Sequence, residues 1–132
     1  MLFDNPVLPL VHSLVAQAKE GEIRLFDLVP SSTQDYPFVF IADVLEAPSD
    51  DKDGQSLDVV LGVYSDARGL VDACGLINKT LQAFRQAKDW TKIEEVRMSN
   101  EGFTLLTNEN AGRMLRYLAQ TINVQFKIKR NG

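Results

Sequence analysis

The chain has little of the two residue types that most often build metal centres and catalytic sites. It holds one cysteine, Cys74, and one histidine, His12, among its 132 residues. One cysteine cannot form an intramolecular disulfide, and two such residues fall short of the three or four ligands of a zinc site. We therefore expect no disulfide, no metal ion and no cofactor, and we expect that the protein is not an enzyme.

Long apolar runs and an excess of basic residues are also missing. No segment approaches the roughly 20 consecutive apolar residues that a membrane-spanning helix needs, so we expect no membrane partner. The opening residues MLFDNPVLPL have no basic start and carry Asp4, which is untypical of a signal peptide and favours a cytoplasmic protein. The formal net charge is −4, whereas surfaces that grip duplex nucleic acid are usually strongly basic.

What is present is an ordinary globular composition. Hydrophobic residues make up 45% of the chain and charged residues 24%, which excludes a disordered or fibrous protein. The length suits one hydrophobic core, and no repeat, low-complexity tract or linker divides the sequence. We therefore expect a single domain over residues 1–132.

A first helix is predicted directly after Asn5. The Asn5 side chain can accept a backbone N–H bond at the N-cap, and Pro6 suits the first helical position. Gly21 is a typical C-terminal stop. Between them, apolar residues recur at helical spacing and form one narrow stripe: Val7, Leu10, Val11, Leu14, Val15 and Ala18.

A second helix is predicted from Ser65 or Asp66, both good N-caps, to about Lys88. It also carries a single apolar stripe, made of Leu70, Ala73, Cys74, Ile77, Leu81 and Phe84. Its opposite face is polar, with Asp72, Asn78, Lys79, Gln82 and Arg85. Such a helix packs flat on a sheet and exposes its other side to water.

Five segments are predicted as strands. Glu22–Leu28 is a short strand, and Phe38–Glu46 is rich in residues that favour strands and is first apolar on both faces. Leu57–Tyr64 has one strongly apolar face and pairs with Phe38–Glu46 as an antiparallel hairpin. Thr91–Ser99 is charged and alternating, as expected of an exposed or partner-covered strand. Thr121–Lys129 alternates strictly, which indicates a half-buried antiparallel strand.

The connecting segments are marked by turn residues. Residues 30–35 and Ala47–Gln55 are predicted loops, and Asn108–Gly112 is a predicted turn. Arg113–Ala119 is compatible with either a strand or a helical turn. The order helix, strand, strand, strand, helix, strand, strand predicts an α+β fold, with a mainly antiparallel sheet of about four to five strands and two helices packed on one face.

Several single residues suggest chemistry but have a simpler interpretation. His12 lies off the first stripe and is predicted at the surface or an interface. Cys74 lies within the second stripe and is predicted to be a buried small hydrophobe. The basic residues Lys127, Lys129 and Arg130 are predicted to form a solvated face, whereas Trp90 and Tyr117 suit either interface anchors or the edge of the core.

Three blocks of the sequence resemble one phage protein family. They are YPFVFIADV (Tyr36–Val44), LDVVLGVYSDARG (Leu57–Gly69) and LINKTLQAF (Leu76–Phe84). The shared features are a Tyr-Pro entry to a hydrophobic strand, a following strand that ends Val63-Tyr64-Ser65, and a helix that opens shortly after Gly69. In these features, and in its element order, the chain resembles the tail completion or tail terminator family of long-tailed bacteriophages and prophages.

The resemblance implies a structural role in virion assembly. Members of that family form homo-oligomeric rings, usually hexamers, at the head-proximal end of the tail tube. The ring stops growth of the tube and joins it to the head connector, which is the head-tail joining step. The implied partners are further copies of the chain, the tail tube protein and the head connector protein, and DNA passes through without sequence-specific binding. The implied location is the virion tail, and the host cytoplasm during assembly.

Two polar segments are the candidates for subunit or tube contacts. One is the Ala47–Gln55 loop, whose charged residues do not meet the spacing of a calcium loop, and the other is the Thr91–Ser99 strand. The candidate residues are Asp50, Asp51, Lys52, Asp53, Lys92, Glu94, Glu95 and Arg97. The negative net charge also predicts an acidic ring lumen that does not retain DNA.

Three alternatives remain open on the sequence. Another head–tail connector or minor capsid protein would differ in its partner and not in its chemistry. A small-molecule-binding regulatory α+β module would need a concave apolar pocket with convergent polar groups. An enzyme would need paired acids with perturbed pKa values in one cleft.

Overall fold

The computed structural model describes residues 5–27, 37–49, 54–66, 70–110 and 113–129. Within this part, the chain forms an α+β fold of two helices and five strands. In chain order the elements are α1 (Val7–Glu20), β1 (Leu25–Phe26), β2 (Phe38–Glu46), β3 (Gln55–Asp66), α2 (Leu70–Arg85), β4 (Ile93–Asn110) and β5 (Arg113–Ile128).

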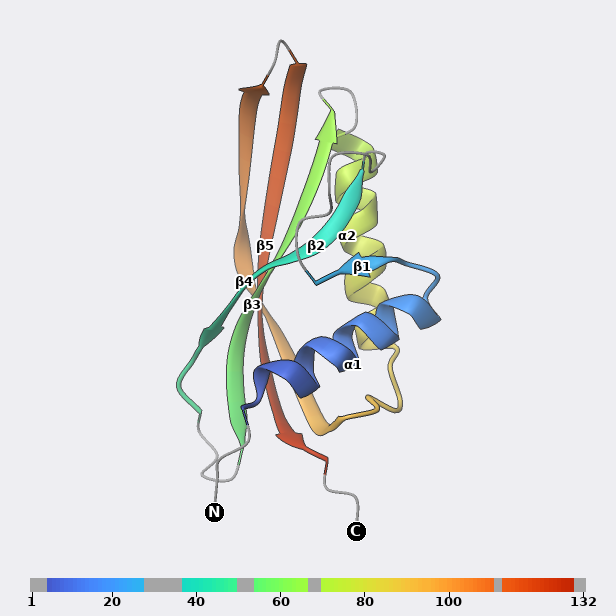
Figure 1. Cartoon of the computed structure of the whole chain (residues 1–132), viewed down its shortest axis with the longest axis vertical. Helices are drawn as coiled ribbons and strands as arrows, with labels where there is room; N and C mark the ends of the chain where they lie inside the picture. Colours follow the sequence, from blue (N-terminus) through green and yellow to red (C-terminus); the bar gives the residue numbers. More distant parts are fainter. Residues whose placement is uncertain (1–4, 28–36, 50–53, 67–69, 111–112, 130–132) are drawn as a thin grey trace.

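The five strands form one mixed sheet in the order β1-β2-β3-β5-β4 (Figure 1). Only the short β1 runs parallel to its neighbour, while the pairs β2–β3, β3–β5 and β4–β5 are antiparallel. The predicted fold class and the β2–β3 hairpin are therefore confirmed. The sheet order leaves β1 at one edge and β4 at the other.

Both helices pack on the same face of the sheet. Alternate residues of β3, from Leu57 to Val63, are buried, and they belong to one core cluster with Leu14 of α1 and Phe84 of α2. Because alternate residues of a strand share one face, both helices must lie on that face, as Figure 1 shows. The Asn5 side chain accepts a backbone bond at the helix start as predicted, since the Val7 N–H donates to Asn5 Oδ1 at 2.8 Å, but the helix begins at Val7 and Pro6 is the residue before it.

The predicted start of the second helix is wrong. Ser65 and Asp66 are the last residues of β3, where they pair with Arg116 and Leu115 of β5. The strand therefore continues through the expected N-caps, and the helix runs from Leu70 to Arg85. Long-range pairing with β5 outweighs the local preference of Ser and Asp for helix caps.

The buried side of α2 also differs from the prediction at Cys74, which is exposed. At about 100° per residue, Cys74 and Thr80 lie on opposite flanks of a stripe centred on Ile77. The Thr80 flank is the covered one, because α1 packs there and a Cβ at Gly21 would lie 2.9 Å from Ala83 Cβ. Thr80 is accordingly fully buried.

The strands of the second half are longer than predicted. The segment Arg113–Ala119, for which the sequence allowed either a strand or a helical turn, is part of β5. β4 extends to Asn110, so Asn108–Asn110 belong to a strand rather than to a turn. Gln55 already belongs to β3, and the predicted loop at residues 30–35 lies outside the described residues.

Candidate interaction surface

The predicted charged strand is the free edge of the sheet. Strand β4 pairs with β5 on one side, and no other strand of the described chain pairs with its outer side. The four contact candidates of this segment, Lys92, Glu94, Glu95 and Arg97, are all exposed. Charged side chains on an edge strand oppose unwanted pairing with other sheets, and they remain available for a specific partner.

A bulge shapes the first half of β4. Glu94 pairs with Lys127 and Arg97 pairs with Gln125, so Glu95 and Val96 together oppose the single residue Phe126. Glu95 has a φ of 52°, a left-handed conformation that is costly for residues other than glycine. A bulge bends and twists the edge, which hinders indiscriminate strand pairing.

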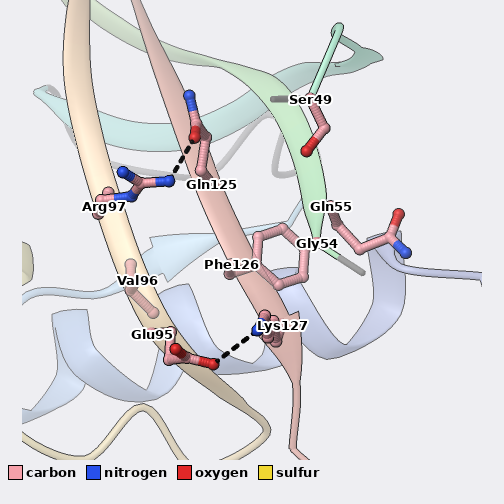
Figure 2. Close-up of a pocket in the computed structure, with 9 residues that line it drawn as sticks. All are labelled: Ser49, Gly54, Gln55, Glu95, Val96, Arg97, Gln125, Phe126 and Lys127. Carbon is pink, nitrogen blue, oxygen red and sulfur yellow. Dashed lines mark hydrogen bonds and ion pairs between the residues drawn. The ribbon is translucent and has the colours of Figure 1, made fainter. Parts of the chain in front are cut away.

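Two side-chain bonds connect the bulged segment to β5, as the dashed lines of Figure 2 show. Arg97 Nη2 donates to Gln125 Oε1 at 3.1 Å. The Glu95 carboxylate lies 3.2 Å from Lys127 Nζ. Exposed ion pairs of this kind are worth about 0–1 kcal/mol, so these contacts orient the charges of the edge more than they stabilise the fold.

The structure brings the two predicted contact segments together at one end of the sheet. A cavity of about 310 Å³ is lined by Ser49, Gly54 and Gln55 from the β2–β3 connection and by Glu95, Val96 and Arg97 from β4 (Figure 2). Gln125, Phe126 and Lys127 of β5 also line it. The candidates Asp50, Asp51, Lys52 and Asp53 lie outside the described residues.

A hydrogen-bond network holds the start of β4 against α1. The Lys92 N–H donates to Ser13 Oγ at 3.2 Å, and Gln17 Nε2 donates to the carbonyl of Asp89. The Asp89 carboxylate accepts from Lys129 Nζ at 2.8 Å and from the Thr91 N–H at 3.0 Å. The Lys129 hydrogen bond, the Thr91 hydrogen bond and the Lys129 charge together lower the pKa of Asp89.

The second half of β4 carries exposed apolar residues that the sequence predictions missed. Phe103, Leu105 and Leu106 are all exposed. The sequence does indicate them, because three of the four residues Phe103-Thr104-Leu105-Leu106 are apolar. This segment follows a second bulge in β4. There the Gly102 N–H donates to Asn100 Oδ1 at 3.1 Å, and Gln120 donates to the Gly102 carbonyl at 3.1 Å.

The other single residues considered in the sequence lie at the surface, in the core or in an aromatic cluster. His12 is exposed, as predicted. Trp90 is buried against Phe84, with ring centroids 5.9 Å apart. Tyr117 belongs to an aromatic cluster on the sheet face opposite the helices, and its ring centroid lies 4.9 Å from that of Tyr64. Burial raises the pKa of Tyr117, and the nearby Tyr64 and Asp43 add to this effect.

The basic end of the chain is less solvated than predicted. Lys127 and Lys129 are half-buried, and each lies against a carboxylate, Glu95 and Asp89 respectively. Arg130 lies outside the described residues. The two lysines thus pair β5 with a charge on β4 and with one on the segment before it.

The described surface is a free strand edge that carries both charged and apolar side chains. Among the described residues, no group of three or more His, Cys, Asp or Glu side chains lies close enough to hold a metal ion. No helix in the described ranges is long and apolar enough to cross a membrane. The outer edge of β4 carries charged side chains along its first half and exposed apolar side chains along its second half.

The left-handed conformation of Glu95 allows a stability test of the bulge. Replacing Glu95 with glycine removes the backbone strain, at the cost of one exposed ion pair, so the free energy of unfolding should change by less than about 0.5 kcal/mol. The neighbouring change Glu94→Gly should lower it by about 0.5–1 kcal/mol, because glycine weakens a regular strand. Urea titration of both variants measures the difference, and equal losses would contradict the bulge geometry.

Comparison with known proteins gives no family assignment. No protein-family model matches the sequence, and no curated protein matches it. Among solved structures, a chain of a structure described as "Virion of native gene transfer agent (GTA) particle" superposes with a TM-score of 0.49 at 18% sequence identity. The match covers 86% of this chain and 83% of that chain. A superposition this loose assigns no function.

Proposed function

We propose that this chain is a structural protein of a phage-like virion, and more narrowly the tail terminator that caps the head-proximal end of the tail tube. The ring it forms would stop tube growth and bind the head connector. The motif blocks Tyr36–Val44, Leu57–Gly69 and Leu76–Phe84 support this proposal through their resemblance to that family.

One structural observation carries the proposal furthest. The two segments that the sequence marks as contact candidates are far apart in the chain, yet their described parts line the same cavity beside the free edge of β4. A surface built from two distant segments supports the proposal, because it gives a partner contacts from both β4 and the β2–β3 connection. Another head–tail connector protein would use the same surface with a different partner.

A complementation experiment tests this role. In a phage or prophage that lacks the gene, we expect overlong tail tubes and heads without tails, because nothing stops the tube or joins it. The intact chain should restore normal tails, while a variant without Ser49–Gly54 should not, although its circular dichroism stays that of a folded chain. Electron microscopy of the particles measures tail length and head attachment.

A matched control separates the contact surface from general damage. Asn78→Ser with Lys79→Ser changes two exposed polar residues on α2, away from the cavity, and should restore normal tails as well as the intact chain does. Normal tails in the absence of the gene would refute the tail-end role. Full rescue by the loop deletion would refute the role of the β2–β3 connection in it.

A further inference from the structure

A row of hydrogen-bonded side chains crosses the sheet from β4 through β5 to β3, and we call it the polar row. Arg97 Nη2 donates to Gln125 Oε1 at 3.1 Å, and Gln125 Nε2 donates to Asn123 Oδ1 at 3.4 Å. Asn123 Nδ2 donates in turn to Asp58 Oδ1 at 2.9 Å and to Ser56 Oγ at 3.0 Å. Asn123 and Gln125 alternate with core residues of β5, so the row lies on the sheet face opposite the helices.

The two ends of the polar row fix the direction of every bond in it. The Arg97 guanidinium can only donate, and the ionised Asp58 carboxylate can only accept. Each amide between them must therefore accept on the Arg97 side and donate on the Asp58 side, and an amide that turned over would lose its bonds. Asn123 is only 8% exposed, which makes such a loss costly. The row thus holds the Arg97 side chain in one orientation from three strands.

The charge of Arg97 has no carboxylate partner among the described residues. Its side chain bonds only to the neutral Gln125 amide there, while Glu95, two positions away, pairs with Lys127 at 3.2 Å. A guanidinium has five N–H donors, and Arg97 is exposed. The amide therefore orients the positive charge without neutralising it, and most of the Arg97 donors stay available to a ligand.

The cavity beside Arg97 gives such a ligand room. It measures about 310 Å³, and Gln55 of β3 lines it from the other side (Figure 2). Its charged lining residues in the described chain are Arg97, Lys127 and Glu95, so two cations accompany one anion. The cavity thus has a surplus positive charge, although the whole chain has a net charge of −4.

The ligand that this charge pattern fits is a single carboxylate on another protein. A carboxylate matches the guanidinium fork, because it can accept two parallel hydrogen bonds from one arginine. A nucleic acid would bring many phosphates, which the exposed Glu94 and Glu101 of the same strand and the negative chain as a whole would repel. A lone carboxylate needs only the local surplus of positive charge.

We propose that Arg97 binds an Asp or Glu carboxylate of a partner protein at this cavity, and that Gln125 and Asn123 are positioning residues that hold Arg97 for it. The inference rests on the proposed function, in which a partner docks here, and deepens it by naming the chemical group that the partner contributes. Because the polar row already fixes the arginine, less side-chain entropy is lost when the carboxylate binds.

A titration with a small probe tests the site on the intact chain. The probe is the tripeptide Gly-Glu-Gly, capped at both ends so that its one charge is the Glu carboxylate. Nuclear magnetic resonance follows the Arg97 Nε–H signal and the side-chain amide signals of Gln125 and Asn123. We expect saturable shifts of all three signals with this probe. Neither capped Gly-Gln-Gly nor a short thymidine oligonucleotide should produce them.

Two variants separate the charge from its orientation. Arg97→Gln removes the charge and should abolish the saturable shifts at Gln125. Gln125→Leu keeps the charge but removes its orienting bond, so the affinity for the tripeptide should fall about two- to fivefold, as expected for one exposed polar contact. Lys92→Gln removes an exposed cation that does not line the cavity, and should bind as the intact chain does. Circular dichroism checks that each variant is folded.

Several results would overturn the carboxylate site. They are an intact chain without saturable shifts, equal shifts with Gly-Gln-Gly, undiminished binding by Arg97→Gln or by Gln125→Leu, and tighter binding of the oligonucleotide than of the tripeptide. Much tighter binding by a chain with Asp50→Asn, Asp51→Asn and Asp53→Asn together would also overturn it, because a carboxylate of the same chain would then be the ligand of Arg97.

The titration and the complementation experiment fail independently. Loss of the carboxylate site leaves the tail-end role standing, because tail length and head attachment are measured without the tripeptide. Conversely, saturable tripeptide binding together with normal tails in the absence of the gene would uphold the site and refute the tail-end role.

Discussion

Replacing Phe84 with alanine should lower the free energy of unfolding by about 3–5 kcal/mol. The Phe84 side chain is 2% exposed and lies in the core cluster in contact with Trp90, so its truncation leaves a cavity. Since small proteins are stable by only about 5–15 kcal/mol, the loss should be visible as a large shift of the urea midpoint.

The matched control for this truncation lies on the same helix. Val71 is 82% exposed, so Val71→Ala should change the free energy of unfolding by no more than about 0.5 kcal/mol. A loss below about 1 kcal/mol for Phe84→Ala, with an unchanged urea slope, would mean that α2 does not pack on the sheet as described.

Replacing Gly62 with alanine should be the second most damaging small change, with a loss of about 1–3 kcal/mol. A Cβ at this position of β3 would lie 2.7 Å from Phe40 Cζ and 2.8 Å from Tyr117 Cε1. Both atoms belong to rings that stack over the glycine, and Phe40 is only 3% exposed. The rings must therefore shift, which disturbs the aromatic cluster that covers this face of the sheet.

The same substitution at Gly75 should have the opposite effect on the free energy of unfolding. It lies within α2, and nothing stands within 4 Å of a Cβ placed there. Alanine favours a helix interior over glycine by about 0.5–1 kcal/mol, so Gly75→Ala should raise the free energy of unfolding. Thermal unfolding of both variants tests the pair, and a stabilising Gly62→Ala would contradict the stacking of Phe40 and Tyr117.

The aromatic cluster around Gly62 also distinguishes the two faces of the sheet. One face is covered by the helices, whereas the other carries the stacked rings of Phe40, Tyr64 and Tyr117.

Part of the candidate interaction surface could be predicted, because the pattern that marks it lies within a few neighbouring residues of the sequence. The charge alternation of Thr91–Ser99 is typical of a strand at the edge of a sheet, and the structure places that strand at the edge. The meeting of Ser49 and Gln55 with Glu95 and Arg97 in one cavity was not predictable, since it depends on β5 lying between β3 and β4.

The sequence by itself determined that there are two helices and where the central parts of most strands lie, although it left Arg113–Ala119 open. Asn5 caps the first helix, the apolar stripes place both helices on a sheet, and the alternation of Leu57–Tyr64 and Thr121–Lys129 makes strands. These features depend on residues within a few positions of one another, so the local pattern contains the necessary physical information.

Only the tertiary structure decided where β3 ends, which flank of α2 is covered and which apolar side chains stay exposed. Ser65 pairs with Arg116 instead of capping a helix, Cys74 faces solvent because α1 occupies the other flank, and Phe103 stays exposed on the second half of β4. Each outcome depends on backbone pairing or packing between residues distant in the chain. The free energy of these long-range contacts outweighs local preferences of about 1 kcal/mol or less per residue.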